Sequence, residues 1–287
     1  MPGTAELLAD AVRELGADRD RAAAQREAQI LLGLVLEKSR AWLAAHGDEP
    51  VTAEAAAKFI SLVRRRTRGE PIAYLVGTRE FHGIEFRVTP DVLIPRPETE
   101  LLVDAALERL PAQAACEVLD LGTGSGCVAI SLAAERQLAR VMACDRSRAA
   151  LNVASQNALR CGVRVEFRES DWFGAWAGRR FDLIVANPPY IAAGDRHLSQ
   201  GDLRFEPQIA LSVGSDGLSA IREIVAEAPW HLHAGGWLIF EHGYDQAAAC
   251  IKLMREAEFS DLFALQDLAG LPRICGGRLL TAKTLNR

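Results

Sequence analysis

The chain has 287 residues, 49% of them hydrophobic and 25% charged, with a formal net charge of -5 at pH 7. This composition excludes a disordered or membrane-embedded protein, and the negative charge means that any contact with nucleic acid would need a local basic patch. Because no charged segment followed by an apolar one opens the chain, and no run of about 18 apolar residues occurs, we predict a cytoplasmic protein without a membrane partner.

Residues 1–75 are rich in Ala, Leu, Glu and Arg, with apolar positions at helical spacing, and predict a small helical bundle. Its last helix is expected to begin near Thr52 and to end in a basic run, Arg64, Arg65, Arg66 and Arg68. Cations at a helix C-terminus complement the helix dipole, so a solvated structural end is one interpretation. The other is a docking surface for ribosomal RNA or an acidic partner, because four arginines exceed what a cap needs.

Residues 76–95 predict a β-hairpin linker, from the alternating apolar residues Ile84, Phe86 and Val88 and the glycines at likely turns. From there the chain alternates strands with helices, which predicts a parallel sheet covered by helices. The expected strands are 116–121, 140–145, 163–167, 181–186 and 235–241, and the expected helices are 125–135, 147–161, 217–230 and 244–257.

A glycine-rich turn follows the first of these strands. In Gly122-Thr123-Gly124-Ser125-Gly126 the glycines let the backbone approach a ligand and expose N–H groups at a helix start. Asp145 ends the next strand and can accept both hydroxyls of a ribose, while Trp172 offers an aromatic plane for adenine or fills the core. The spacing G-x-G-x-G differs from the dinucleotide fingerprint G-x-G-x-x-G and is typical of enzymes that use S-adenosylmethionine.

The tetrapeptide Asn187-Pro188-Pro189-Tyr190 follows an apolar strand and indicates methyl transfer to a planar nitrogen. Two prolines stiffen the turn, so the Asn187 carboxamide oxygen and the Pro188 carbonyl can accept the two hydrogens of an NH2 group. Tyr190 adds a flat face on which the acceptor can lie. A plain proline turn that closes a strand is the alternative.

Six cysteines are scattered along the chain without a C-x-x-C pair, and His231 and His233 have no carboxylate or cysteine cluster beside them. We therefore predict reduced, mostly buried thiols and no metal site.

Together these motifs resemble the class I S-adenosylmethionine-dependent methyltransferases. Residues 69–74, 81–83 and 94–100, with 214–218 and 267–270, narrow the resemblance to the HemK/PrmC family and extend it over nearly the whole chain. The resemblance implies N5-methylation of the glutamine in the Gly-Gly-Gln motif of peptide chain release factors. It also implies an α/β fold: a Rossmann-like, seven-stranded, mostly parallel sheet with helices on both faces, preceded by a helical bundle and a β-hairpin linker.

The expected domains are a substrate-docking domain at 1–75, the linker at 76–95 and the methyltransferase domain at 96–287. Asn187, Pro188 and Tyr190 are the predicted catalytic residues, and Pro189 joins them in binding substrate. The predicted cofactor-binding residues are Gly122, Thr123, Gly124, Ser125, Gly126, Asp145, Trp172 and Asn187.

Three other functions share part of this pattern. DNA or RNA adenine-N6 and cytosine-N4 methyltransferases use a near-identical turn on flipped bases, but the acidic chain has no evident target-recognition domain. A non-catalytic protein that clamps a translation factor would not need intact glycine and proline turns. An NAD-dependent oxidoreductase would show the G-x-G-x-x-G spacing.

Overall fold

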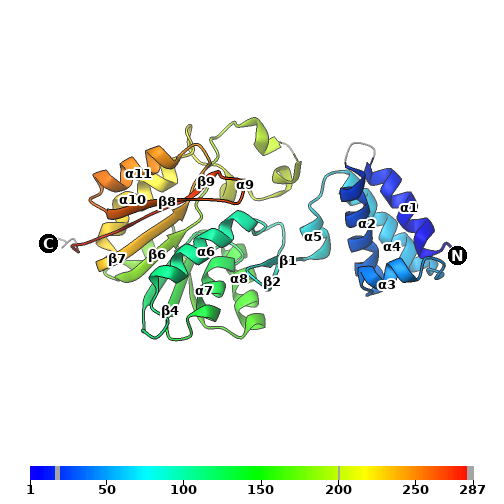
Figure 1. Cartoon of the computed structure of the whole chain (residues 1–287), viewed down its shortest axis with the longest axis horizontal. Coiled ribbons are helices and arrows are strands. Elements are labelled where there is room, and N and C mark those ends of the chain that lie inside the picture. Colours follow the sequence, from blue (N-terminus) through cyan, green and yellow to red (C-terminus); the bar gives the residue numbers. More distant parts are fainter. Residues whose placement is uncertain (17–19, 200, 283–287) are drawn as a thin grey trace. The chain divides into compact units, whose positions relative to one another are not determined.

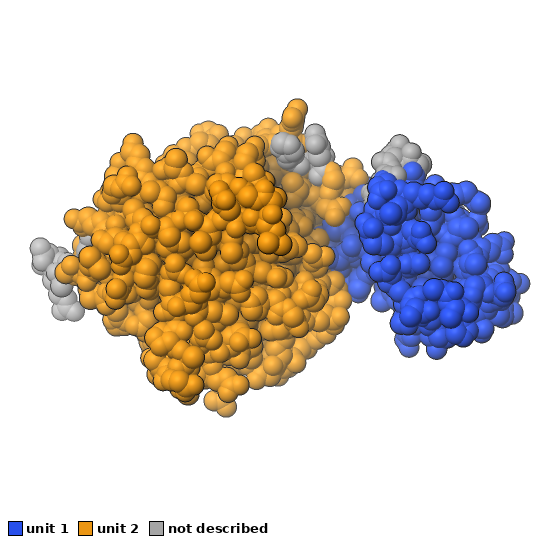
Figure 2. Space-filling model, viewed as in Figure 1, with its two compact units in different colours: residues 1–77 blue, residues 78–287 orange. Residues whose placement is uncertain are grey.

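The computed structural model of the protein describes residues 1–16, 20–199 and 201–282. Residue contacts divide the chain into two compact units, residues 1–77 and 78–287 (Figure 2). In the part of the chain that is described, no helix is both long enough and apolar enough to cross a membrane.

The first unit is a bundle of helices around a core that includes Leu31, Leu32 and Phe59. Side chains set where its helices begin: Asp20 accepts hydrogen bonds from two backbone N–H groups at the start of α2, and Thr52 accepts one at the start of α4. The helices are α1 (Thr4–Leu15), α2 (Arg21–Leu36), α3 (Arg40–Ala45), α4 (Ala53–Thr67) and α5 (Ile72–Val76).

Two arginines of the basic run at the end of α4 form ion pairs inside this unit. Arg66 is only 7% exposed, and its guanidinium donates to both carboxylate oxygens of Glu27 at 2.9 and 2.7 Å. Arg65 donates to Glu70 at 2.7 Å. Arg66 is therefore a structural residue, and the prediction that all four arginines form one docking surface is wrong for it.

The second unit opens with a two-stranded hairpin, β1 (Thr78–Phe81) and β2 (Ile84–Arg87). His82 and Gly83 join the strands with φ values of 50° and 73°, as expected for the tight turn that matches strand twist. Val76, which the predicted linker of residues 76–95 included, is instead the last residue of α5. Pro71 precedes that helix, and Gly77 ends it with a φ of 85°.

A seven-stranded sheet forms the centre of this unit, in the order β5-β4-β3-β6-β7-β9-β8 (Figure 1). Its first five strands are parallel, and β9 runs antiparallel to both of its neighbours. This confirms the predicted mostly parallel, seven-stranded fold. The strands are β3 (Glu117–Leu121), β4 (Arg140–Asp145), β5 (Val165–Glu169), β6 (Phe181–Ala186), β7 (Leu232–Glu241), β8 (Ser260–Gln266) and β9 (Pro272–Arg278).

Helices cover both faces of the sheet (Figure 1). Val118 and Val185 face one hydrophobic cluster with α6, α7 and α8, while their strand neighbours Leu119 and Ile184 face another with α10 and α11. The α-helices are α6 (Pro97–Arg109), α7 (Cys127–Glu135), α8 (Arg148–Cys161), α9 (Gln208–Leu211), α10 (Ser219–Glu227) and α11 (Ala247–Glu256), and the 3-10 helices are Gly174–Trp176, Arg196–Ser199, Gly201–Phe205 and Ala228–Trp230.

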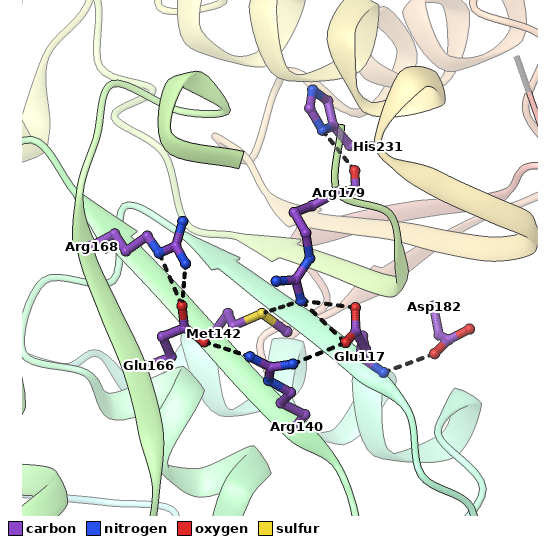
Figure 3. Close-up of polar contacts among 8 residues, drawn as sticks. All are labelled: Glu117, Arg140, Met142, Glu166, Arg168, Arg179, Asp182 and His231. Carbon is purple, nitrogen blue, oxygen red and sulfur yellow. Dashed lines mark hydrogen bonds and ion pairs between the residues drawn. The ribbon is translucent and has the colours of Figure 1, made fainter. Parts of the chain in front are cut away.

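Charged side chains link the amino ends of the central strands (Figure 3). Glu117 at the start of β3 accepts from Arg179 at 3.1 Å and lies 3.6 Å from Arg140, which begins β4. Arg140 also donates to Glu166 of β5 at 3.0 Å. The Glu117 backbone N–H donates to the Asp182 carboxylate of β6 at 2.8 Å. These contacts join the amino ends of β3, β4, β5 and β6 to one another and stabilise this edge of the sheet.

We expect Asn157 of α8 to be a large single contributor to the stability of this unit. It is 1% exposed; its Oδ1 accepts from the Arg87 N–H at 2.8 Å, and its Nδ2 donates to the carbonyls of Arg87 and Ser125 at 3.0 and 2.9 Å. Asn157→Ala should lower the free energy of unfolding by about 2 kcal/mol, measured with urea, because buried backbone groups lose partners. Asn152→Ala, at an exposed position of the same helix, should change it by less than about 0.5 kcal/mol. Equal effects of the two substitutions would contradict this role.

Candidate functional site

The predicted site segments meet at the carboxyl edge of the sheet. The glycine turn follows β3, Asp145 ends β4, and the proline turn follows β6. The strand order reverses beside β3, and ligands of open α/β sheets bind at such a switch point. A cleft of about 230 Å³ lies here; residues from all three segments line it, among them Gly122, Gly124, Asp145, Asn187 and Pro189.

The three glycines of the turn all have left-handed backbone conformations, with φ values of 73°, 55° and 83° at Gly122, Gly124 and Gly126. A Cβ at Gly126 would lie 3.1 Å from the Ala154 Cβ of α8, so this glycine allows the start of α7 to pack closely against α8. A Cβ at Gly124 would meet no atom of the described part of the chain within 4 Å. Gly124 therefore leaves its face of the backbone open to the cleft, as a ligand in close contact requires.

Asp145 holds the glycine turn with one carboxylate oxygen and the start of α8 with the other. One accepts from the Gly124 N–H at 2.9 Å, and the other accepts from the Ser147 N–H at 2.8 Å. Burial raises the pKa of Asp145, while these two hydrogen bonds oppose the rise. A carboxylate has about four acceptor positions, so two are left for a pair of ligand hydroxyls such as those of a ribose.

Trp172 lies beside the same turn and lines the cleft. A Cβ built at Gly122 would be 3.4 Å from the indole Cζ3, so the ring packs over that glycine. The neighbouring Phe173 is buried and stacks on His231 with a centroid distance of 4.5 Å. Phe173 therefore takes the core position, while Trp172 packs at the margin of the same cluster and also lines the cleft.

Hydrogen bonds hold the proline turn from behind. Asn187 donates through Nδ2 to the Thr99 hydroxyl at 3.1 Å, and that hydroxyl donates to the Glu241 carboxylate at 2.7 Å. The Tyr190 hydroxyl donates to the other Glu241 oxygen at 3.0 Å. With Nδ2 occupied, the Asn187 oxygen remains as an acceptor in the cleft.

Glu241 ends β7 and is 1% exposed. Burial raises its pKa, and the hydrogen bonds from Thr99 and Tyr190 and the charge of Arg273 oppose this rise. Burial and the charge of Glu241 raise the pKa of the Tyr190 phenol. Tyr190 is therefore neutral at physiological pH and is no proton acceptor.

Sequence reasoning assigned no role in the site to Thr99, Gly217, Glu241 or Gln246. A Cβ at Gly217 would lie 2.2 Å from the Tyr190 carbonyl oxygen, and Gln246 donates to that oxygen at 3.1 Å. Gly217 thus leaves room for the far end of the proline turn, and Gln246 holds it by a hydrogen bond. One signal was present: a carboxylate that ends a long apolar strand, as Glu241 does, needs buried partners.

Comparison with known proteins covers both units. Residues 98–202 match the family described as "Methyltransferase small domain", and residues 6–77 match the family described as "PrmC N-terminal domain". Proteins named "Release factor glutamine methyltransferase" from Burkholderia pseudomallei and Xylella fastidiosa are 54% and 48% identical to the chain. The alignments cover 88% and 97% of this chain and 91% and 98% of those relatives.

Two solved structures share the fold. The hMettl16 catalytic domain in complex with the MAT2A 3'UTR hairpin 1 has a TM-score of 0.55 and 12% identity over 83% of this chain and 84% of that one. The T. thermophilus 16S rRNA N2 G1207 methyltransferase in complex with AdoMet and guanosine has a TM-score of 0.53 and 22% identity over 70% of this chain and 49% of that one. At these identities the likeness concerns the fold alone.

We expect substitution by alanine at two glycines of the turn to have different effects, on stability at Gly126 and on cofactor binding at Gly124. Gly126→Ala meets Ile130 and Ala154, so it should lower the melting temperature by several degrees. Gly124→Ala should cost about 1 kcal/mol, because alanine is strained in a left-handed backbone conformation, but it places its methyl group in the cleft. It should weaken binding of S-adenosylmethionine, measured by calorimetry, by at least about tenfold while the melting temperature changes less. If Gly124→Ala binds like the wild type, the cofactor does not approach this face.

Proposed function

The chain belongs to the release factor glutamine methyltransferase family, and from this premise we propose that it methylates the side-chain amide nitrogen, N5, of the glutamine in the Gly-Gly-Gln motif of peptide chain release factors, using S-adenosylmethionine. The observation that carries the proposal is the Asn187 carboxamide, whose Nδ2 is held by Thr99 and whose oxygen is left for a planar NH2 group beside the glycine turn. The likeness to the relatives along the whole chain favours a protein glutamine over a nucleobase as the acceptor.

The chain's residues fit S-adenosylmethionine. Asp145 has two acceptor positions to spare for the ribose hydroxyls, and Trp172 would present a ring to adenine. Gly122, Thr123, Gly124 and Ser125 line the cavity that would hold the methionine portion, while Gly126 acts through the packing of the helix that follows the turn. When bound, the cofactor supplies an electrophilic methyl group.

Positioning is the main task of the protein in this reaction. An amide nitrogen is a poor nucleophile, and no side chain is basic enough to deprotonate it. The Asn187 oxygen and the Pro188 carbonyl accept its two hydrogens, which orients the nitrogen and stabilises the positive charge that develops there. Pro189 and Tyr190 hold the amide plane. The methylated nitrogen then loses one proton to water, and no catalytic base is needed.

The remaining roles concern the units and their partners. We assign docking of the release factor to residues 1–75, a linker role to residues 76–95 and catalysis to residues 96–287. If the end of α4 also contacts ribosomal RNA or an acidic partner, Arg64, Arg65 and Arg68 are the exposed residues that do so. Because release factors act in translation, the enzyme is expected to work in the cytoplasm.

Mass spectrometry tests the function directly. A release factor incubated with this protein and S-adenosylmethionine should gain one methyl group on the glutamine of its Gly-Gly-Gln peptide. A labelled-methyl assay with DNA and RNA offered side by side should leave the nucleic acids unlabelled. Label on a nucleobase, with none on the release factor, would replace the proposal with the nucleobase alternative. Binding of cofactor without turnover would favour a non-catalytic clamp.

We expect substitutions at Asn187 and Asp145 to separate catalysis from cofactor binding. Asn187→Ala removes an acceptor for developing charge, so kcat should fall about a hundredfold, on the order of 3 kcal/mol, with little change in cofactor affinity. Asp145→Asn should instead weaken cofactor binding, with a smaller change in the chemical step. Single-turnover kinetics and calorimetry on both variants measure the two effects. Wild-type turnover in Asn187→Ala, or wild-type affinity in Asp145→Asn, would refute the corresponding role.

A further inference from the structure

Two residues behind the Asn187 carboxamide, Thr99 and Glu241, decide its orientation. The hydrogen bonds from Thr99 and Tyr190 and the charge of Arg273 favour the ionised form of Glu241. As a carboxylate, Glu241 can only accept hydrogen bonds, and the Thr99 hydroxyl has a single proton. That proton lies on the 2.7 Å bond to Glu241. Thr99 therefore faces Asn187 with a lone pair, and only the NH2 side of the carboxamide can approach it, as the 3.1 Å contact shows.

Burial keeps this arrangement from exchanging with water. Thr99 and Glu241 are 2% and 1% exposed. The second oxygen of Glu241 is held by the Tyr190 hydroxyl at 3.0 Å, so the carboxylate is fixed from both sides. Each oxygen of the carboxylate thus has its own hydroxyl donor, and neither donor can reverse its bond without leaving a buried polar group unsatisfied.

The consequence at the cleft is chemical. If the Asn187 carboxamide were turned over, its NH2 group would face the NH2 group of a substrate amide, and two donors would meet. With its oxygen in the cleft it accepts a hydrogen and favours positive charge on the nitrogen. The two orientations have the same shape, so the outline of the cleft cannot select between them. A hydrogen-bond partner behind Asn187 must do so.

We propose that Glu241, acting through the Thr99 hydroxyl, is a positioning residue that fixes the Asn187 carboxamide with its oxygen toward the acceptor nitrogen. The proposal deepens the proposed function and rests on it for its kinetic consequences. Neither residue touches the substrate. Their effect is on the share of enzyme molecules in which Asn187 presents an acceptor, so it should be felt in kcat.

Three substitutions test this hydrogen-bond relay, which runs from Glu241 through Thr99 to Asn187. Thr99→Val keeps the shape and removes the hydroxyl, and Glu241→Gln keeps the shape but can turn an NH2 group toward Thr99, which would reverse the bond to Asn187. Each should lower kcat on a Gly-Gly-Gln peptide by at least about tenfold, with the KM values for peptide and cofactor within about threefold of wild type. Thr99→Ser restores the hydroxyl and should recover most of the activity.

The control is Ser131→Ala, which removes another buried hydroxyl, one that has no hydrogen-bond partner among the described residues, and it should leave kcat unchanged. Because Glu241 acts through Thr99, adding Glu241→Gln to Thr99→Val should cost less than it costs in the wild type. The proposal is overturned if Thr99→Val or Glu241→Gln keeps wild-type kcat, if Thr99→Ser fails to recover it, if the losses multiply, or if they appear only in cofactor affinity.

A second measurement does not depend on the proposed function. The Asn187 side-chain NH2 resonances, assigned by their absence in Asn187→Ala, should show slow hydrogen exchange in the wild type. Thr99→Val and Glu241→Gln should shift these resonances and speed their exchange, while Ser131→Ala should not. If the wild type does not methylate the peptide, this result still decides the relay and the failure belongs to the proposed function. Unshifted Asn187 resonances in both variants would refute the relay itself.

Discussion

The carboxyl ends of β3, β4, β6 and β7 meet at one edge of the sheet, and the rest of the site depends on this constraint. Parallel pairing brings the ends of strands that are far apart in the sequence to the same level. The glycine turn, Asp145, the proline turn and Glu241 each occupy the first positions after or at the end of one of these strands. At the opposite edge, ion pairs join the amino ends of neighbouring strands. That edge therefore stabilises the sheet, while the carboxyl edge carries the site.

Glu241 links the stability of this edge to its chemistry. Moving a carboxylate out of water costs several kcal/mol unless hydrogen bonds and nearby cations compensate. Its compensation comes from the hydroxyls of Thr99 and Tyr190 and from the charge of Arg273. Thr99 also holds Asn187, and Tyr190 belongs to the proline turn. The hydrogen bonds that make the buried charge tolerable therefore also orient the residues that would contact the acceptor.

Local sequence signals predicted the bounds of an element well where a short apolar run lies between clear turns. The strands at 140–145 and 181–186 match the structure in full, because they are short apolar runs between clear turns. The predicted helix 217–230 is longer than α10, because Pro229 lies in a separate 3-10 helix that follows it. Helix α6 and strands β8 and β9 were not delimited. Strand β8 lies at the edge of the sheet and none of its residues is fully buried. Its apolar residues 262–265 are consecutive and do not alternate with polar ones, so the pattern of a half-buried strand is weak.

The sequence by itself determined the reaction type, because Asn187 to Tyr190 and Gly122 to Gly126 carry their chemistry in backbone restrictions that any context preserves. Its likeness to a known family also indicated the fold and the substrate. Only the tertiary structure decided which way the Asn187 carboxamide faces, because that depends on Thr99 and Glu241, 88 residues before it and 54 after it in the chain. It also decided that Arg66 is a buried ion-pair partner. Hydrogen-bond direction and burial arise from distant segments that pack together, and no local pattern encodes them.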